Sequence, residues 1–393
     1  MQNDELQIVT SAEFRAEVER NLTRDAAAVA LDSRVPNARL VATQVKYLQR
    51  AARKLPSYYQ ARAVLPSLAF EQSSSEQCAA HKRFEGRLAV DLTCGLGVDT
   101  LHLSRRFERV VALEHNPTLA AITRHNLSLM GAHNVEVITT EAEEFLATLD
   151  HADLIYADPD RRSSEGRKMV CLADCSPNLE LLLPTLRVKA DRLSFKLSPL
   201  FDLTEARKAF GADADLEVIS LGGEVKEVVV YISNLADSPT QGLTTATALG
   251  LGSYTATAEE RNGRADIGSS IPFESAHYTH LVVPDAALRK AGVVEGWCRQ
   301  EGLDPRGPYG FATSEPTTPL GHIYTIEESH PYSPKRLKPI IGRTIQLIRH
   351  SFPLSSGAIC KALGAREGAG ATWAFAEIEG KMWALRLGAI NNR

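Results

Sequence analysis

The stretch from Ala89 to Thr100 constrains the fold of this chain more than any other part of the sequence. A short apolar run ends in Asp91, a turn with Gly95 and Gly97 follows, and the next apolar residues have the spacing of a helix. A buried parallel strand that leads into a helix through a glycine-rich turn is the opening unit of a doubly wound nucleotide-binding sheet. The two glycines allow positive φ and let a ligand approach the backbone. Many such turns bind nothing, so the pattern alone identifies no ligand.

The sequence after this turn predicts an α/β sheet in which strands alternate with helices. We expect parallel strands at 88–92, 109–113, 135–138, 153–157 and 192–197, with helices at 99–106, 117–130 and 178–186. Two further strands, 216–221 and 225–232, are separated only by Gly222-Gly223-Glu224, which predicts an antiparallel hairpin. A parallel sheet finished by one antiparallel strand distinguishes a Rossmann-like class I methyltransferase sheet from the Rossmann domain of a dehydrogenase.

The segments on either side of this sheet have different patterns. Residues 1–66 predict helices, one capped by Ser11 and continuing to Leu31, and another from about Asn37 to just before Pro56. Three serines followed by Glu76-Gln77 predict a further helix, with Ser74 or Ser75 as its N-cap. After residue 234 we expect a β-element with a loop, a small α/β unit, and a last piece with a strand, a helix and a hairpin. The predicted domains are 1–70, 71–275, 276–325 and 326–393.

Charge is distributed unevenly along the 393 residues. The net charge is −4, yet the segment from Ser333 onward holds ten Lys or Arg and three Glu, so the tail is basic and the remainder acidic. Six cysteines are too few for a disulfide framework, and Cys171 and Cys175 have no second pair at zinc spacing. We therefore expect no metal site. The N-terminal residues lack the apolar core of a signal peptide and no run reaches membrane-spanning length, which favours a cytoplasmic protein without membrane contact.

Polar residues follow the strands at the edge of the sheet where open α/β sheets bind ligands. Asp91 precedes the glycine turn, Glu114 ends the second strand and suits the two hydroxyls of a ribose, Glu141 follows the third strand near an adenine, and Asp158 follows the fourth. Together with the antiparallel strand, this order predicts S-adenosylmethionine as cofactor. The residues expected to contact it are Gln72, Ser75, Asp91, Thr93, Gly95, Gly97, Asp99, Thr100, Glu114, His115, Asn116, Glu141, Ala142 and Asp158.

Methyl transfer from a sulfonium requires positioning and exclusion of water more than covalent help from the protein. Asp158 is placed to orient a nucleophile or to take its proton, and we assign the catalytic region to Asp158, Pro159, Arg161 and Arg162. The arginines suit a phosphate or another anion, although pairing with Glu165 and solvent is the alternative. A cysteine that attacks pyrimidine C6 has no obvious candidate, since the nearest is Cys171.

Four motifs carry a resemblance to a known family over nearly the whole chain. They are Glu71-Gln72-Ser73-Ser74-Ser75-Glu76, Asp91-Leu92-Thr93-Cys94-Gly95-Leu96-Gly97-Val98-Asp99, Asp158-Pro159-Asp160-Arg161-Arg162 and Asp174-Cys175-Ser176-Pro177-Asn178. With these the chain resembles bacterial class I methyltransferases that carry a ferredoxin-like insert and a C-terminal THUMP-like α+β domain. The stretch from Tyr278 to Ala291 looks like the insert, and the tail looks like the THUMP-like domain. Cys94 and Asp160 stand where the family pattern has Gly and Ala.

The resemblance implies an RNA partner, because THUMP domains proper bind RNA. The basic tail agrees with this, and Trp373 and Trp383 are either part of a core or a surface on which bases stack. We therefore expect a methyltransferase of structured RNA, a tRNA or an rRNA. Two other interpretations stay open: a methyltransferase of a small molecule or a protein, and an RNA-binding protein that binds the cofactor without catalysis.

Overall fold

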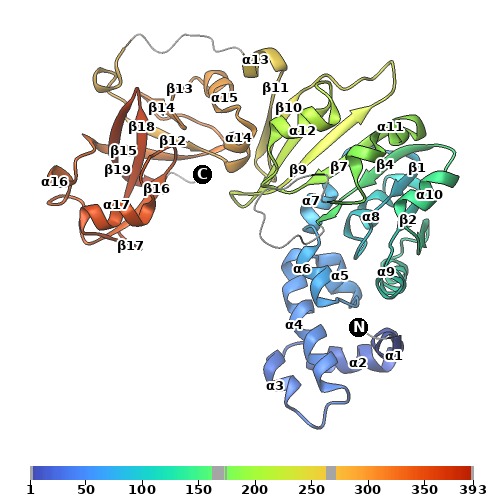
Figure 1. The fold of residues 1–393 in the computed structure, drawn as a ribbon. Coiled ribbons are helices and arrows are strands. Elements are labelled where there is room, and N and C mark those ends of the chain that lie inside the picture. Colours follow the sequence, from blue (N-terminus) through green and yellow to red (C-terminus); the bar gives the residue numbers. More distant parts are fainter. Residues whose placement is uncertain (1–2, 162–171, 173–174, 263–270, 391–393) are drawn as a thin grey trace. The chain divides into compact units, whose positions relative to one another are not determined.

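The computed structural model describes residues 3–161, 172, 175–262 and 271–390 (Figure 1). The chain divides into two compact units. One comprises Met1–Asp215 with Glu227–Gln241, and the other comprises Leu216–Lys226 with Gly242–Arg393. No described helix combines the length and the apolar character needed to cross a membrane.

The first unit begins with six helices, whereas the periodicity predicts two within residues 1–66. They are α1 (Asn3–Thr10), α2 (Ala12–Asn21), α3 (Ala26–Ala30), α4 (Ala38–Lys54), α5 (Pro56–Ala61) and α6 (Ser67–Gln72). Ser11 caps α2, because its side chain accepts the N–H of Phe14 at 3.1 Å. The prediction that this helix continues to Leu31 is wrong. The chain leaves the helix after Asn21 and starts α3 with a new cap, Asp25, which accepts the N–H of Ala28.

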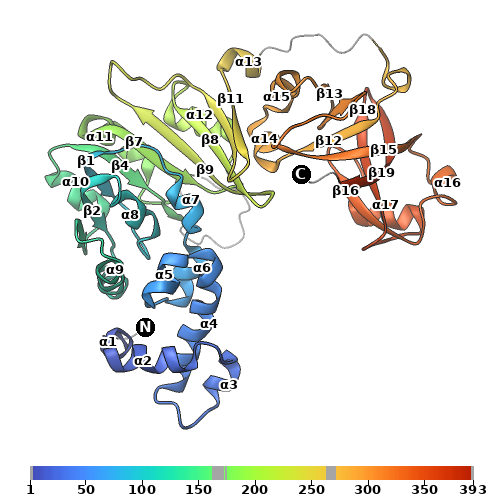
Figure 2. The same ribbon diagram turned by 180° about the vertical axis from the view of Figure 1, so that it is seen from behind.

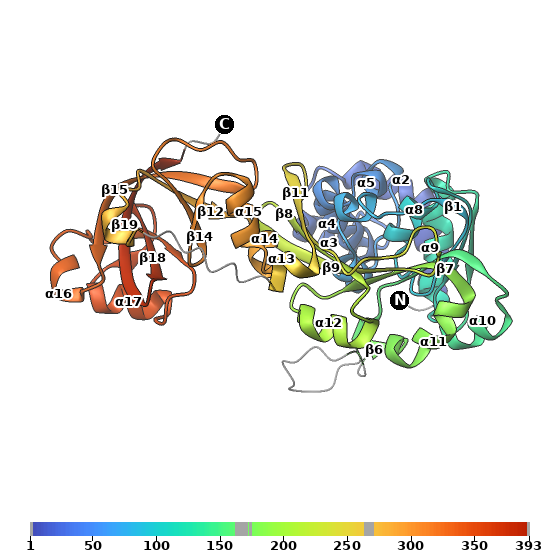
Figure 3. The ribbon, with the colours of Figure 1, turned by 90° about the horizontal axis from the view of Figure 1, so that it is seen from above.

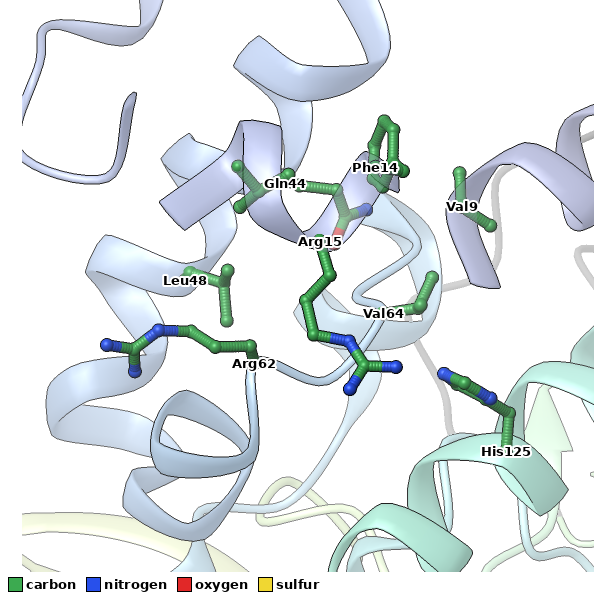
Figure 4. A pocket seen from close by; sticks show the side chains of 9 residues that line it. Val9, Phe14, Arg15, Gln44, Leu48, Arg62, Val64 and His125 are labelled. Carbon is green, nitrogen blue, oxygen red and sulfur yellow. The ribbon is translucent and has the colours of Figure 1, made fainter. Parts of the chain in front are cut away.

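The helical region packs on a helix of the sheet domain, α9 (Pro117–Leu129), which α1 and α5 contact (Figures 1 and 2). Asn126 of α9 bonds both the N–H and the carbonyl of Val64 at 2.8 Å. Figure 4 shows a small hollow beside this contact, in which the Arg15 side chain reaches toward His125. Its volume of about 10 Å³ admits one water at most, so we regard it as a packing gap.

The strands in the sheet of the first unit have the predicted directions. Its strands lie in the order β3-β2-β1-β4-β7-β9, with the bounds β1 (Gly86–Asp91), β2 (Phe107–Leu113), β3 (Val135–Ile138), β4 (Ala152–Ala157), β7 (Ala190–Leu197) and β9 (Glu224–Ser233). The first five pair in parallel, whereas β9 runs antiparallel to β7. The antiparallel last strand is thus confirmed. Gly222 and Gly223, which precede it, have φ of 63° and 79°, as a tight two-residue turn requires.

Helices cover both faces of this sheet (Figure 3). They are α7 (Glu76–Ala80), α8 (Val98–Leu103), α9, α10 (Ala142–Thr148), α11 (Leu179–Lys189) and α12 (Leu203–Phe210). α8 and the N-terminal helices lie on one side, and α10, α11 and α12 lie on the other (Figure 3). A short two-stranded ribbon joins β5 (Asp160–Arg161) to β6 (Cys175–Ser176). A parallel sheet covered on both faces buries most residues of its central strands, which explains their short apolar runs.

The second unit contains two groups of strands. In one, β8 (Asp215–Leu221) pairs in parallel with β10 (Thr244–Ala248), which pairs antiparallel with β11 (Gly252–Ala256). The other is an eight-stranded sheet in the order β13-β14-β12-β15-β19-β18-β16-β17. Its bounds are β12 (His280–Pro284), β13 (Asp304–Arg306), β14 (Tyr309–Ala312), β15 (Gly321–Pro331), β16 (Thr344–Arg349), β17 (Arg366–Glu367), β18 (Ala371–Ile378) and β19 (Lys381–Ile390). The remaining elements are α13 (Ala258–Asn262), η2 (Phe273–Ser275), α14 (Ala286–Ala291), α15 (Val294–Gln300), α16 (Pro334–Leu337) and α17 (Ser356–Leu363).

The two tryptophans of the closing hairpin belong to the core of the second unit. Trp373 is completely buried beside Phe375 and Ile359, and Trp383 is 4% exposed and packs edge-on against Phe273. Neither ring is accessible to an RNA base. Of the two interpretations of these residues, the core is confirmed.

The Tyr58 hydroxyl links the helical region to the glycine turn. It is buried and donates to the carbonyl of Leu96 at 3.0 Å. We expect Tyr58→Phe to lower the free energy of unfolding by about 1 kcal/mol, because the buried carbonyl then loses its donor. Urea denaturation measures this. The control is Tyr59→Phe on the same helix, because the Tyr59 hydroxyl bonds no described residue. Equal stability of the two variants would contradict the role of Tyr58.

Candidate functional site

The glycine turn between β1 and α8 has one closed side and one open side. Gly95 and Gly97 have φ of 51° and 83°. A Cβ on Gly97 would lie 2.8 Å from Cγ2 of Thr123, so any side chain there would collide with α9. A Cβ on Gly95 would meet nothing within 4 Å, although the Gly95 carbonyl is held by the Thr123 hydroxyl at 2.7 Å. Gly97 therefore serves packing, whereas the open side of the turn is at Gly95.

Asp91 organises the ends of two neighbouring strands. Its carboxylate accepts the N–H of Thr93 at 3.0 Å and the hydroxyl of Thr100 at 2.6 Å, and it is 1% exposed. The Thr93 hydroxyl in turn accepts the N–H of Asp158, after β4, at 2.7 Å. Burial raises the pKa of Asp91 to about 7, because its two hydrogen bonds only partly offset the loss of solvent. The predicted residues Asp91, Thr93, Thr100 and Asp158 thus lie together.

Glu114 ends β2 with a buried carboxylate, as the sequence predicts. It is 7% exposed, and its Oε1 accepts the N–H of Asn116 at 2.8 Å. Asn116 caps α9 through its side chain, and His115 between them is exposed. An acid fixed at the end of the second strand is the group that binds ribose hydroxyls in nucleotide-binding α/β sheets.

The other predicted cofactor contacts lie on the connections around the sheet. Glu141 is exposed and precedes α10, and Ala142, the first residue of that helix, is buried. Gln72 is the last residue of α6 and is exposed. Ser75 caps α7 by accepting the N–H of Cys78 at 3.3 Å, so of the two predicted caps Ser75 is the one used.

Asp158 belongs to a cluster of charged side chains that sequence patterns do not identify. Lys196, the penultimate residue of β7, forms an ion pair with Asp158 and donates to the Ser74 hydroxyl at 2.7 Å. Ser74 donates to Asp99 at 3.1 Å, and Lys196 lies 4.0 Å from the same carboxylate. Only 11% of the Lys196 side chain is exposed, against 34% for Asp158. The charged ends of β4 and β7 are therefore joined to α8.

A second buried lysine extends this cluster. Lys82, 3% exposed, pairs with Glu227 of β9 and lies 3.4 Å from Asp99. Burial opposes its charge, but Glu227 and Asp99 outweigh that effect and raise the pKa of Lys82. Burial likewise opposes ionisation of Asp99, and the two lysines reverse this and lower its pKa. Both lysines and Asp99 are thus charged at neutral pH.

Asp158 differs from Asp99 in its titration. Burial raises its pKa to about 6 although Lys196 acts in the opposite direction. A carboxylate that titrates near neutrality and is partly open to solvent is suited to exchange a proton with a bound group. Pro159, also half-buried, follows it directly.

The remaining catalytic predictions fall at the edge of the described part of the chain. The backbone of Arg161 pairs with Cys175 in the β5–β6 ribbon. Arg162 and Cys171 lie outside the described residues. Cys175 is buried, as are the other described cysteines, Cys78, Cys94, Cys298 and Cys360. Within the described ranges no cluster of His, Cys, Asp and Glu is arranged to hold a metal ion.

Comparison with known proteins agrees with this geometry. The THUMP domain-like family matches residues 321–389. An uncharacterized S-adenosylmethionine-dependent methyltransferase of Mycobacterium tuberculosis is 28% identical over 304 residues, which span 75% of this chain and 79% of that protein. A tRNA/tmRNA (uracil-C(5))-methyltransferase of Neisseria meningitidis is 30% identical over 149 residues, 32% of this chain and 40% of that protein.

A solved structure resembles the chain over its full length. The crystal structure of a putative methyltransferase from Porphyromonas gingivalis has a TM-score of 0.81 at 25% identity, and the match covers 100% of both chains. The strand order with antiparallel β9, the acids at the strand ends and these similarities agree with one another. This chain is an S-adenosylmethionine-dependent methyltransferase with a C-terminal THUMP-like domain.

Proposed function

We propose that this enzyme methylates a structured RNA, a tRNA or an rRNA, which the second unit binds. The observation that carries the proposal is the THUMP-like match at residues 321–389 on a segment rich in free cations. Seven side chains there are exposed and form no ion pair with any described residue: Lys335, Arg336, Lys338, Arg343, Arg349, Lys361 and Arg366. Such a surface suits the phosphates of a nucleic acid. The partial similarity to a tRNA methyltransferase supports the same substrate class.

We further propose that the cofactor lies over the open side of Gly95. Glu114 would accept the ribose hydroxyls, and the residues after β1 would face the methionine part. The cofactor supplies an electrophilic methyl group on a sulfonium, so the protein's part is alignment of the nucleophile and disposal of its proton. We assign both tasks to Asp158, because its pKa lies near neutrality. Its carboxylate forms an ion pair with Lys196, and its backbone N–H donates to the Thr93 hydroxyl.

The atom that receives the methyl group is a separate question. Attack on pyrimidine C6 requires an accessible cysteine thiolate. Cys175, in the β5–β6 ribbon after Asp158, is buried, and Cys171 lies outside the described residues. We therefore extend the similarity to the uracil-C(5) enzymes to the class of substrate and not to their target atom.

Replacement of Glu114 tests the cofactor site. We expect Glu114→Gln to weaken S-adenosylmethionine binding by about 10- to 100-fold, because a hydrogen bond to a charged group contributes about 1.5–3 kcal/mol. Calorimetric titration measures the affinity. Glu108→Gln removes the same charge from an exposed position on the same strand and should bind like the wild type. Unchanged affinity of Glu114→Gln would exclude the proposed ribose contact.

Replacement of Lys196 tests the role of Asp158. Asp158 accepts a proton only as the carboxylate, so the methylation rate of the wild type should rise with pH through about 6. In Lys196→Met the pKa of Asp158 loses the influence that lowers it, and the rise should shift upward by about a unit or more. Lys196→Arg should restore the original profile. Lys208→Met, which breaks an exposed ion pair in the same unit, is the control. A profile that is identical in wild type and Lys196→Met would contradict the assignment.

The acceptor class is tested directly by label transfer. We expect methyl-labelled S-adenosylmethionine to label RNA extracted from a strain that lacks the gene, and RNA from the parent strain to take up little. Asp158→Asn should bind cofactor yet transfer at least tenfold less label. In a parallel assay on a total extract of the same strain, label that resists ribonuclease and stays in protein or small molecules would favour the alternative substrate classes. Tight RNA binding without any label would favour a protein that binds RNA without catalysis.

A further inference from the structure

A pocket of about 370 Å³ lies entirely within the second unit, outside the methyl-transfer site. Residues of β12, β15 and β16 and the first residues of α14 and α17 line it. Ligand pockets for small molecules and single nucleotides have volumes of about 300–1,000 Å³. The hollow is thus large enough for one nucleotide.

The pocket contains two arginines that no carboxylate neutralises. Arg289 of α14 is half-buried, and Arg349 at the end of β16 is exposed. Neither forms an ion pair with a described residue, and each spends one donor on a backbone carbonyl, of Pro284 and of Phe352 respectively. A guanidinium has five donors in a planar fork, so most of this capacity is available. Partial burial of an unpaired charge is costly unless an anion completes it.

One carboxylate, Asp285, lines the pocket, and its charge partly counteracts the effect of burial on the pKa of Arg289 without forming an ion pair with it. Asp285, the carboxylate that lines the pocket, caps α14 by accepting the N–H of Ala287 at 2.8 Å and also accepts the Ser220 hydroxyl at 2.5 Å. His350 also lines the pocket. Burial, followed by the positive charges of Arg289 and Arg349, lowers its pKa to about 4. It is therefore neutral at pH 7 and brings no third positive charge.

Apolar side chains, Val283 and Leu347, also line the pocket, together with Tyr324. Cationic and apolar side chains in one pocket correspond to the two parts of a nucleotide, its phosphate and its base. We propose that this pocket binds one nucleotide of the RNA substrate, with a single backbone phosphate shared by Arg289 and Arg349. The inference rests on the proposed function, because it takes the substrate to be RNA.

The test measures binding of fluorescently labelled total tRNA to the full-length enzyme over a range of salt concentrations. Arg289→Gln and Arg349→Gln should each weaken binding about tenfold, and each should reduce the slope of log affinity against log salt by about one, the value for one lost phosphate contact. Because both arginines hold the same phosphate, the double variant should lose little more than either single variant. Arg299→Gln removes an exposed charge of the same unit that lies outside the pocket and is already paired with Glu295, so it should leave the affinity within about twofold.

Two further outcomes separate this inference from the proposed function. If RNA takes up label in the methylation assay and the pocket variants bind it like Arg299→Gln, the pocket assignment is wrong and the substrate class stands. If the wild type neither binds nor labels RNA, both fail. Adenosine monophosphate is the second probe: binding that the double variant abolishes, with RNA affinity unchanged, would make the pocket a site for free nucleotides and overturn the inference.

Discussion

The ion pairs of Lys82 and Lys196 are the interaction on which the site depends. Two lysines almost without solvent require carboxylates at contact distance, since an isolated buried charge is far too costly. Asp99, Asp158 and Glu227 supply them, and they come from α8, the end of β4 and β9. Removal of one member would leave its partner charged and buried. The cluster therefore fixes the positions of segments that are far apart in the sequence.

The same cluster gives two neighbouring aspartates different properties. Asp99 lies near both lysines, which lower its pKa. Asp158 pairs with Lys196 only, and burial and the nearby carboxylates raise its pKa to about 6. One acid is then a fixed charge of the scaffold, and the other is able to exchange a proton at physiological pH. The Thr93 hydroxyl, which holds the Asp158 N–H, restricts where that carboxylate can point. The scaffold thus determines both the titration and the position of the proposed proton acceptor.

Sequence patterns predicted the sheet well because its strands are buried on both faces and read as short apolar runs between turns. The six strands that form the sheet of the first unit lie within about two residues of their predicted bounds, and Asp91 and Glu114 lie at strand ends as predicted. Other elements had weaker sequence patterns. The segments that form β10 and β11 are rich in Thr and Ala, and α12 was not predicted from the sequence. The domain boundaries at 70, 275 and 325 stay predictions.

The cluster itself was missed for a physical reason. Ser74, Lys82, Lys196 and Glu227 meet only after four segments have packed, and no spacing in the chain encodes that meeting. The sequence contained one signal for it. Lys196 lies between two apolar residues near the end of a buried strand, Phe195-Lys196-Leu197, and a charge at such a position needs a partner. Single-segment patterns find groups that act from the end of one strand. Charged groups that pair across strands can be identified only from the three-dimensional fold.

The unpaired arginines of the second unit present the opposite situation to the paired lysines of the first. Where the protein supplies its own carboxylates, as at Lys82, the charges stabilise one arrangement of the chain and are closed to ligands. Arg289 and Arg349 form no ion pair with the described residues, so most of their donors are available to an anion from outside. The buried pairs thus hold the groups proposed for methyl transfer in place, and the proposed substrate site uses the unpaired cations.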